Sequence, residues 1–152
     1  MRNMNIKYFK QETKYTCGAA SMRIVLASLG FIKTEKQVSK LLKTNTVRGT
    51  WHESFSNLAE KLRLNYVVGR GSTIIELKKT INNKYIIIIC YFIPKENVDH
   101  YAVIKKINNN YIVLADPFYG DNHKLPLKKF VKNWKSDSKW DNEKRWFIGI
   151  KK

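Results

Sequence analysis

Cys17 combines the residue type of a nucleophile with a position that can activate it. Residues 17–29 carry apolar side chains at helical spacing, and Gly30 is typical of a helix end. A cysteine at the start of a helix lies beside free backbone N–H groups and the positive end of the helix dipole, which favour the thiolate over the thiol. Because the thiolate is the nucleophilic form, the sequence predicts a reactive cysteine at position 17.

His100 and Asp116 could supply the base and the orienting acid that such a thiol needs. His100 opens one stretch with alternating apolar residues, and Asp116 follows a second stretch at residues 111–115. The linker at residues 108–110 is all asparagine, which favours a tight turn and an antiparallel hairpin. The two open ends of a hairpin lie side by side, so we expect both side chains at the same edge of a sheet. An imidazole there can take the thiol proton, and the carboxylate can set its tautomer.

In this order, these residues resemble the C39 cysteine peptidases, papain-like proteases best known as bacteriocin-leader processing domains. The matching features are Gln11 ahead of Cys-Gly-Ala, then His100-Tyr-x-Val-Ile, then Asp116-Pro-x-x-Gly. The resemblance implies that Cys17 is the nucleophile, that His100 is the general base and later the acid, and that Asp116 orients it. It also implies that Gln11 donates a hydrogen bond from its side-chain amide to the oxyanion. One such donor lowers the activation barrier by roughly 3 kcal/mol.

Two features separate the chain from leader peptidases fused to transporters. Many of those domains stand at the front of an ABC transporter and have a second cysteine soon after the nucleophile. Here Ser21 and Met22 follow Cys-Gly-Ala-Ala, and the chain stops at Lys152. Free-standing C39-like peptidases are therefore at least as good a match. Cleavage after a Gly-Gly leader site is one expected specificity, and a separate ABC transporter is one expected partner.

Three functions of different kinds follow from these residues. The first is peptide-bond hydrolysis through a thioester on Cys17, with a peptide or protein as substrate. The second is acyl transfer to an amine, or deamidation, on the same three residues, since such a site supports any acyl transfer whose acceptor can reach it. The third is a non-catalytic module that binds peptide or nucleic acid. The joint presence of Gln11, Cys17, His100 and Asp116 argues against the third.

The remaining histidines and the second cysteine point to structural roles. Thr50 and Glu53 match a capping box, which places His52 in the solvated first turn of a helix, and His123 follows a polar turn. Neither histidine has a second ligand at metal spacing, so we expect no metal and no cofactor. Cys90 lies in an uninterrupted apolar run that reads as a buried strand, so we expect no disulfide and a reducing compartment.

The order of the elements indicates an α+β fold of papain-like layout, with N-terminal helices packed on a mainly antiparallel C-terminal sheet. With 152 residues, 43% of them hydrophobic, and no linker composition, the chain suits one domain over residues 1–152. The expected helices begin near Cys17, Thr34, Thr50 and Thr73, with a short one at about residues 127–134. The expected strands lie at about residues 64–68, 85–92, 100–107, 111–115 and 146–150.

Charge and hydropathy bear on partners and location. The chain has 29 Lys and Arg against 12 Asp and Glu, a formal net charge of +17 that is scattered along the sequence. The basic residues either form a surface that only contacts solvent or attract an acidic partner, such as an acidic peptide, a nucleic acid or an anionic membrane. The aromatic residues between basic ones are more consistent with side chains that cover the hydrophobic core than with side chains that stack on nucleotide bases. Nucleic acid is therefore the less favoured partner. No apolar run suits a signal peptide or a membrane span, so we expect a cytoplasmic protein.

Overall fold

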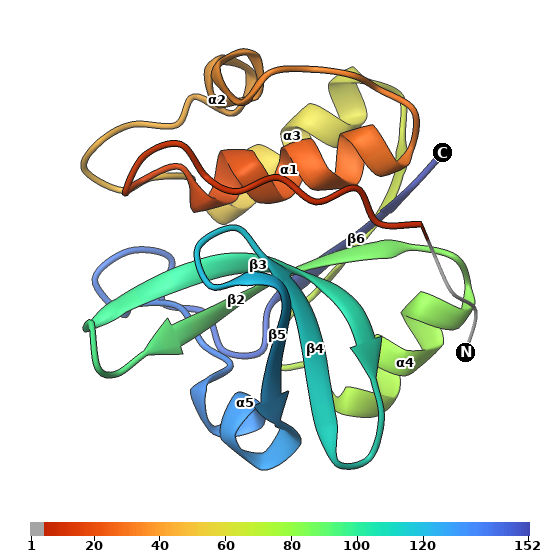
Figure 1. Ribbon diagram of the computed structural model, residues 1–152, viewed down its shortest axis with the longest axis vertical. Helices are drawn as coiled ribbons and strands as arrows, with labels where there is room; N and C mark the ends of the chain where they lie inside the picture. Colours follow the sequence, from red (N-terminus) through yellow and green to blue (C-terminus); the bar gives the residue numbers. More distant parts are fainter. Residues whose placement is uncertain (1–4) are drawn as a thin grey trace.

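The protein consists of a central antiparallel sheet between two layers of helices (Figure 1). The computed structural model describes residues 5–152. The helices are α1 (Cys17–Ser28), α2 (Glu35–Leu42), α3 (His52–Lys61), α4 (Ile74–Asn82) and α5 (Leu127–Asn133). The strands are β1 (Asn65–Gly69), β2 (Ile86–Ile93), β3 (Val98–Ile107), β4 (Tyr111–Asp116), β5 (Gly120–Pro126) and β6 (Phe147–Lys151).

The sheet has the strand order β1-β6-β2-β3-β4-β5, and every neighbouring pair is antiparallel. Helices α1, α2 and α3 lie over one face, and α4 and α5 lie against the other (Figure 1). The predicted α+β layout, with N-terminal helices on an antiparallel sheet, is therefore confirmed. No helix within residues 5–152 combines the length and apolar character needed to cross a bilayer.

Strand β2 contributes to both hydrophobic cores, as its unbroken apolar sequence predicts. Ile88 and Cys90 face helices α1 to α3, whereas Ile87, Ile89 and Tyr91 face α4 and α5. Successive side chains of a strand point to opposite faces, so a strand covered on both sides needs an apolar residue at each position. The side chain of Cys90 is 1% exposed, which confirms its predicted burial.

The first two helices begin where their local sequence predicts. Helix α1 starts at Cys17, and Gly30 just beyond its end has a φ of +95°, a conformation that glycine adopts readily. Helix α2 is preceded by Thr34, whose side chain and that of Gln37 each accept a hydrogen bond from the other residue's backbone N–H. This reciprocal pair is a capping box, and it needs no tertiary contact to form.

The predicted capping box of the third helix is wrong. Helix α3 starts one residue later than such a box requires, with Trp51 as its N-cap and no side-chain cap. The hydroxyl of Thr50 instead bonds that of Thr44 at 2.8 Å. Thr50 also packs against the turn of the candidate nucleophile, because a Cβ on Gly18 would lie 2.6 Å from its Oγ1. Gly18 is thus the residue that lets α1 approach this segment so closely.

Strand β5 and the place of His123 within it were not predicted. The segment that was expected to be a polar turn is a strand that pairs with β4 at the edge of the sheet. The ring of His123 stacks on that of Tyr119, with centroids 4.8 Å apart. An edge strand is held by backbone hydrogen bonds on one side and needs no apolar alternation, so its sequence carries little signal.

Candidate active site

Cys17 is the first residue of α1 and is half-buried at the end of the cleft between helices and sheet. Thr16 at the N-cap makes no side-chain hydrogen bond to the helix. The N–H groups of the first turn therefore have no side-chain cap that would offset their partial positive charge. The thiol therefore lies at the positive end of the α1 dipole.

His100 and Asp116 come together at the end of the β3–β4 hairpin. The Nε2 atom of His100 lies 2.6 Å from Oδ1 of Asp116, and both side chains are buried. Strand β3 begins at Val98, two residues earlier than expected, so the hairpin extends past His100. The structure thus brings both residues together where β3 begins and β4 ends, as the hairpin geometry requires.

Cys17 is near enough to His100 to act on the pKa of its imidazole. Burial disfavours the imidazolium, but the charge of a Cys17 thiolate and hydrogen bonds to Asp116 and Cys17 outweigh it and raise the pKa of His100 to about 10. One imidazole therefore bridges the thiol and the carboxylate, with Nε2 on Asp116 and Nδ1 left for Cys17. The arrangement favours a thiolate–imidazolium pair.

The Asp116 carboxylate is fully supplied with hydrogen-bond donors. Its Oδ1 atom accepts from the backbone N–H groups of Phe118 and Tyr119, each at 2.9 Å, as well as from His100. Its Oδ2 atom accepts from the Tyr91 hydroxyl at 2.5 Å. Burial alone would raise the pKa of Asp116, but the bonds from His100 and Tyr91 lower it overall.

Gln11 lies at the same cleft as Cys17, but its side chain is already engaged. Its Nε2 atom donates to the carbonyl of Thr13 at 2.7 Å, and its backbone N–H donates to the carbonyl of Pro117 at 2.9 Å. Its Oε1 atom is buried and has no hydrogen-bond partner within the described residues. A primary amide carries two N–H donors, so the second remains for a ligand in the cleft.

The cleft around Cys17 and His100 encloses about 530 Å³. Four of the exposed large hydrophobic residues line it, and charged residues of both signs lie between them. Such a mixed lining suits a peptide better than a single small anion or cation. The hydrophobic residues are Tyr15, Val47, Val98 and Phe118, and the charged ones include Lys14, Lys139, Glu96 and Asp137.

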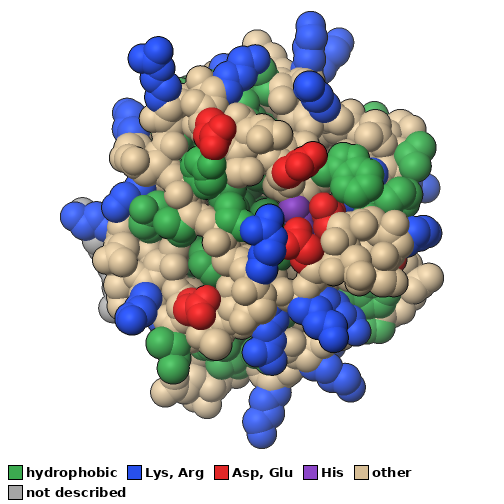
Figure 2. Space-filling view, turned by 180° about the vertical axis from the view of Figure 1, so that it is seen from behind, with side chains coloured by type: hydrophobic (Ala, Val, Ile, Leu, Met, Phe, Trp, Pro, Cys, Tyr) green, Lys and Arg blue, Asp and Glu red, His purple; other side chains and the backbone are tan. Residues whose placement is uncertain are grey.

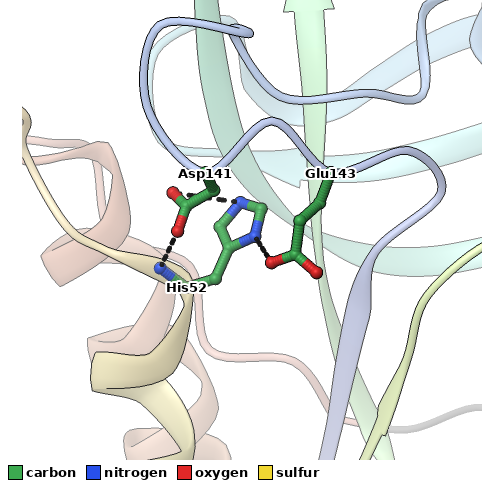
Figure 3. A group of neighbouring side chains, drawn as sticks. All are labelled: His52, Asp141 and Glu143. Carbon is green, nitrogen blue, oxygen red and sulfur yellow. Dashed lines mark hydrogen bonds and ion pairs between the residues drawn. The ribbon is translucent and has the colours of Figure 1, made fainter.

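His52 is buried, which corrects the prediction of a solvated first-turn residue. Its ring stacks on Trp146 with centroids 4.1 Å apart, and Nδ1 lies 2.8 Å from Oε1 of Glu143 (Figure 3). Its backbone N–H donates to Oδ1 of Asp141 at 3.3 Å. Burial lowers the pKa of His52 even though both carboxylates favour its charge. The ring is therefore a structural part of the core beside α3.

Arg48 is a functional candidate that the sequence did not reveal. Its guanidinium lies 3.2 Å from Oδ1 of Asp99 and 2.6 Å from Oδ2 of Asp141, and its side chain is only 3% exposed. Burial opposes its charge, but Tyr101, Asp99 and Asp141 raise the pKa of Arg48 overall. Because Asp99 precedes His100 in β3, Arg48 ties one cleft wall to the strand that bears the histidine. No short-range pattern marks such a pair.

The two carboxylates of the cluster of His52, Asp141 and Glu143 are held by protein donors, whereas Nε2 of His52 is buried without a hydrogen-bond partner among the described residues. Both oxygens of Asp141 are occupied, by the backbone N–H of His52 and by Arg48. Both oxygens of Glu143 are occupied as well, by His52 and by Arg70. All four carboxylate oxygens thus have positive or N–H partners, and the cluster acts as an ion-pair network that holds the 136–145 loop against α3.

We expect the imidazole of His100 to titrate near pH 10 rather than near its ordinary 6.5. A raised folded-state pKa means that the charged pair stabilises the protein fully below pH 6.5 and loses this effect as the pH rises through about 10. Ring-proton NMR across this range tests the expectation. In Cys17→Ala the thiolate is absent, so His100 should titrate at a lower pH. Titration near 6.5 in the wild type would contradict the thiolate–imidazolium pair.

Solved structures of similar fold are peptidase domains. The peptidase domain of Streptococcus ComA, a bi-functional ABC transporter involved in quorum sensing, matches with a TM-score of 0.76 at 20% identity, over 97% of this chain and 98% of that one. A C39-like peptidase from Bacillus anthracis matches with a TM-score of 0.76 at 17% identity, over 98% and 96%. A double glycine motif protease from an AMS/PCAT transporter, in complex with its leader peptide, gives 0.70 at 19% identity, over 99% and 94%.

Comparison of the sequence with protein families assigns the family, which similarity of fold alone does not. No curated protein matches the chain. The family model described as Peptidase C39 family, however, matches residues 5–137, a span that includes the thiol, the imidazole and the carboxylate that the fold brings together. By this match over most of its length, the chain belongs to the Peptidase C39 family.

Proposed function

We propose that the protein is a cysteine peptidase that cleaves peptide bonds through a thioester on Cys17. The observation that carries this proposal is the single imidazole of His100 set between the Cys17 thiol and the Asp116 carboxylate. This is the order of groups that nucleophilic acyl transfer by a thiol requires. Membership of the Peptidase C39 family supports the same reaction.

Each residue has a defined part in the proposed reaction. The Cys17 thiolate attacks the scissile carbonyl carbon, and the resulting oxyanion accepts hydrogen bonds from the Cys17 backbone N–H and the second N–H of Gln11. The imidazolium of His100 then gives its proton to the departing amine as the C–N bond breaks. In the second half, His100 takes a proton from water as the water attacks the thioester carbon. The C–S bond then breaks, which releases the acid and regenerates the Cys17 thiolate beside the His100 imidazolium. Asp116 holds the ring in place throughout.

The proposed substrate is a peptide that lies along the cleft, with a leader peptide cut after Gly-Gly as the first candidate. Structural neighbours support this choice, since one is a double glycine motif protease in complex with its leader peptide. One neighbour belongs to an ABC transporter and another to an AMS/PCAT transporter, which supports a transporter as the proposed partner.

Charge supports an acidic segment in the substrate. Among the described residues, ion pairs with acidic side chains involve only Arg23, Arg48, Arg70 and Lys105 of the lysines and arginines. Figure 2 shows the basic side chains scattered over one face, both at its margin and near its centre, rather than in one continuous patch. Such a distribution supports long-range attraction of an acidic chain more than a single binding site for one anion.

Selective alkylation tests the proposed thiol site without knowledge of the substrate. We expect iodoacetamide to label Cys17 much faster than Cys90 in the folded protein, because burial shields Cys90 and raises the pKa of its thiol. A peptide aldehyde ending in Gly-Gly should modify the same residue. Peptide mapping by mass spectrometry identifies the labelled site.

Two histidine variants provide the controls. His100→Ala removes the cation beside the thiolate and should slow labelling of Cys17 by about tenfold or more. His123→Ala removes a ring that stacks on Tyr119 and does not line the cleft, and should change the labelling rate far less than His100→Ala does. Equally slow labelling of both cysteines in the folded wild type would rule out an activated nucleophile.

A further inference from the structure

Tyr91 binds the oxygen of Asp116 that His100 leaves free. The Tyr91 hydroxyl donates to Oδ2 at 2.5 Å, while His100 contacts Oδ1 at 2.6 Å. Tyr91 and His100 are directly opposite each other on the neighbouring strands β2 and β3, so their side chains emerge on the same face. Their rings meet edge to face, with centroids 5.6 Å apart.

Tyr91 lies behind the site rather than in it. Its side chain is 4% exposed and packs in the core beneath α4 and α5, and it is not among the residues that line the cleft around Cys17. Burial and the nearby Asp116 carboxylate both raise the pKa of Tyr91, so the phenol stays protonated and remains a donor. A substrate in the cleft therefore meets His100 without meeting Tyr91.

We propose that Tyr91 is a positioning residue, whose hydroxyl keeps Asp116 ionised and turned toward His100. This inference rests on the proposed function, since it assigns a role within the same site. A carboxylate held through Oδ1 alone can rotate about its Cβ–Cγ bond and present a different lone pair to the imidazole. The backbone N–H groups of Phe118 and Tyr119 also hold Oδ1, and the donor on Oδ2 adds a second fixed point that opposes the rotation and favours the anion over the acid.

Among the described tyrosines near Asp116, Tyr91 alone donates its hydroxyl to the carboxylate, since Tyr119 bonds it through its backbone N–H. Tyr8 also bonds to Asp116, but its hydroxyl donates to the main-chain carbonyl at 2.8 Å. This difference provides a matched pair of variants, each of which removes one phenol oxygen from the surroundings of the same residue. The other ionisable groups coupled to Asp116 are His100 from β3, Tyr119 from the turn before β5 and His123 from β5. Nearby, Cys17 from α1 acts on His100 and Tyr91, and Asp121 from β5 acts on Tyr8.

The test is the rate of Cys17 alkylation by iodoacetamide as a function of pH in Tyr91→Phe and Tyr8→Phe. Loss of the Tyr91 donor should raise the pKa of Asp116, so the acid limb of the profile should move to higher pH. On that limb the rate should fall by about tenfold, the size expected for one hydrogen bond to a charged group. Tyr8→Phe should leave the profile where it is. Circular dichroism establishes that both variants are folded.

A second substitution covers the case in which Tyr91→Phe does not fold. Incorporation of 3-fluorotyrosine at position 91 alone keeps the hydroxyl and makes it a stronger donor, so the acid limb should move to lower pH. An unchanged profile in folded Tyr91→Phe, or no shift with 3-fluorotyrosine, would overturn the role of Tyr91 while the thiol site stands. A wild-type Cys17 that iodoacetamide does not label would overturn both this inference and the proposed function.

Discussion

Replacement of Cys17 by alanine should abolish peptide cleavage while leaving peptide binding intact. The substitution removes the only atom that forms the thioester, and loss of a nucleophile of this kind lowers turnover on the order of 10⁴-fold or more. Alanine is the best helix former, and Cys17 is only half-buried at the first position of α1, so the fold should persist. Cleavage of a Gly-Gly leader peptide, followed by mass spectrometry, measures the loss.

Binding by the same variant separates an enzyme from a binding module. Isothermal titration of Cys17→Ala with the acidic version of the leader peptide should give the same affinity as the wild type has. The basic version should bind more weakly than the acidic one. Cys90→Ala is the matched control, since it removes a thiol that does not line the cleft, and it should retain turnover. Turnover by Cys17→Ala at the wild-type rate would exclude the proposed nucleophile. Binding without turnover by the wild type would favour the non-catalytic alternative.

Replacement of Arg48 by methionine should cost about 3–5 kcal/mol of unfolding free energy. Methionine keeps much of the buried aliphatic volume but removes the charge that faces Asp99 and Asp141. Two carboxylates that are at most 10% exposed would then lose their shared counter-ion. Urea denaturation followed by tryptophan fluorescence measures the change.

Arg70→Met is the control for this prediction. Arg70 pairs with Glu143 in the same network, but its side chain is 62% exposed, so its loss should cost at most about 1 kcal/mol. We also expect slower Cys17 alkylation in Arg48→Met than in Arg70→Met, because Asp99 adjoins His100 in β3. Similar stabilities for the two variants would show that solvent or local rearrangement compensates the buried acids around Arg48.

Much of the fold and of the candidate site could be predicted from short-range patterns. The start of α1 at Cys17, the capping box of α2 and the buried strand through Cys90 each depend on residues within a few positions of one another. The approach of His100 to Asp116 follows from one hairpin, in which a short turn determines which strand ends are neighbours. The catalytic roles of these residues and of Gln11 stay predictions, to be tested by the experiments above.

The predictions that failed concern segments whose state depends on distant contacts. The place of His123 in β5 depends on backbone pairing with β4, and its polar sequence carries no strand signal. His52 was expected in solvent because the first turn of an amphipathic helix is commonly exposed. Its burial depends on Glu143, which lies 91 residues further along the chain and supplies the bond that a buried imidazole needs.

The sequence by itself determined the types of the reactive groups, the helix that begins at the thiol and the hairpin that joins imidazole to carboxylate. Only the tertiary structure decided what supports them. Tyr91 meets Asp116 across 25 residues of chain, and Arg48 meets Asp141 across 93. Secondary structure follows from the repeat of apolar residues along one segment, whereas a buried polar group is satisfied by whichever partner the packing of the layers brings within reach.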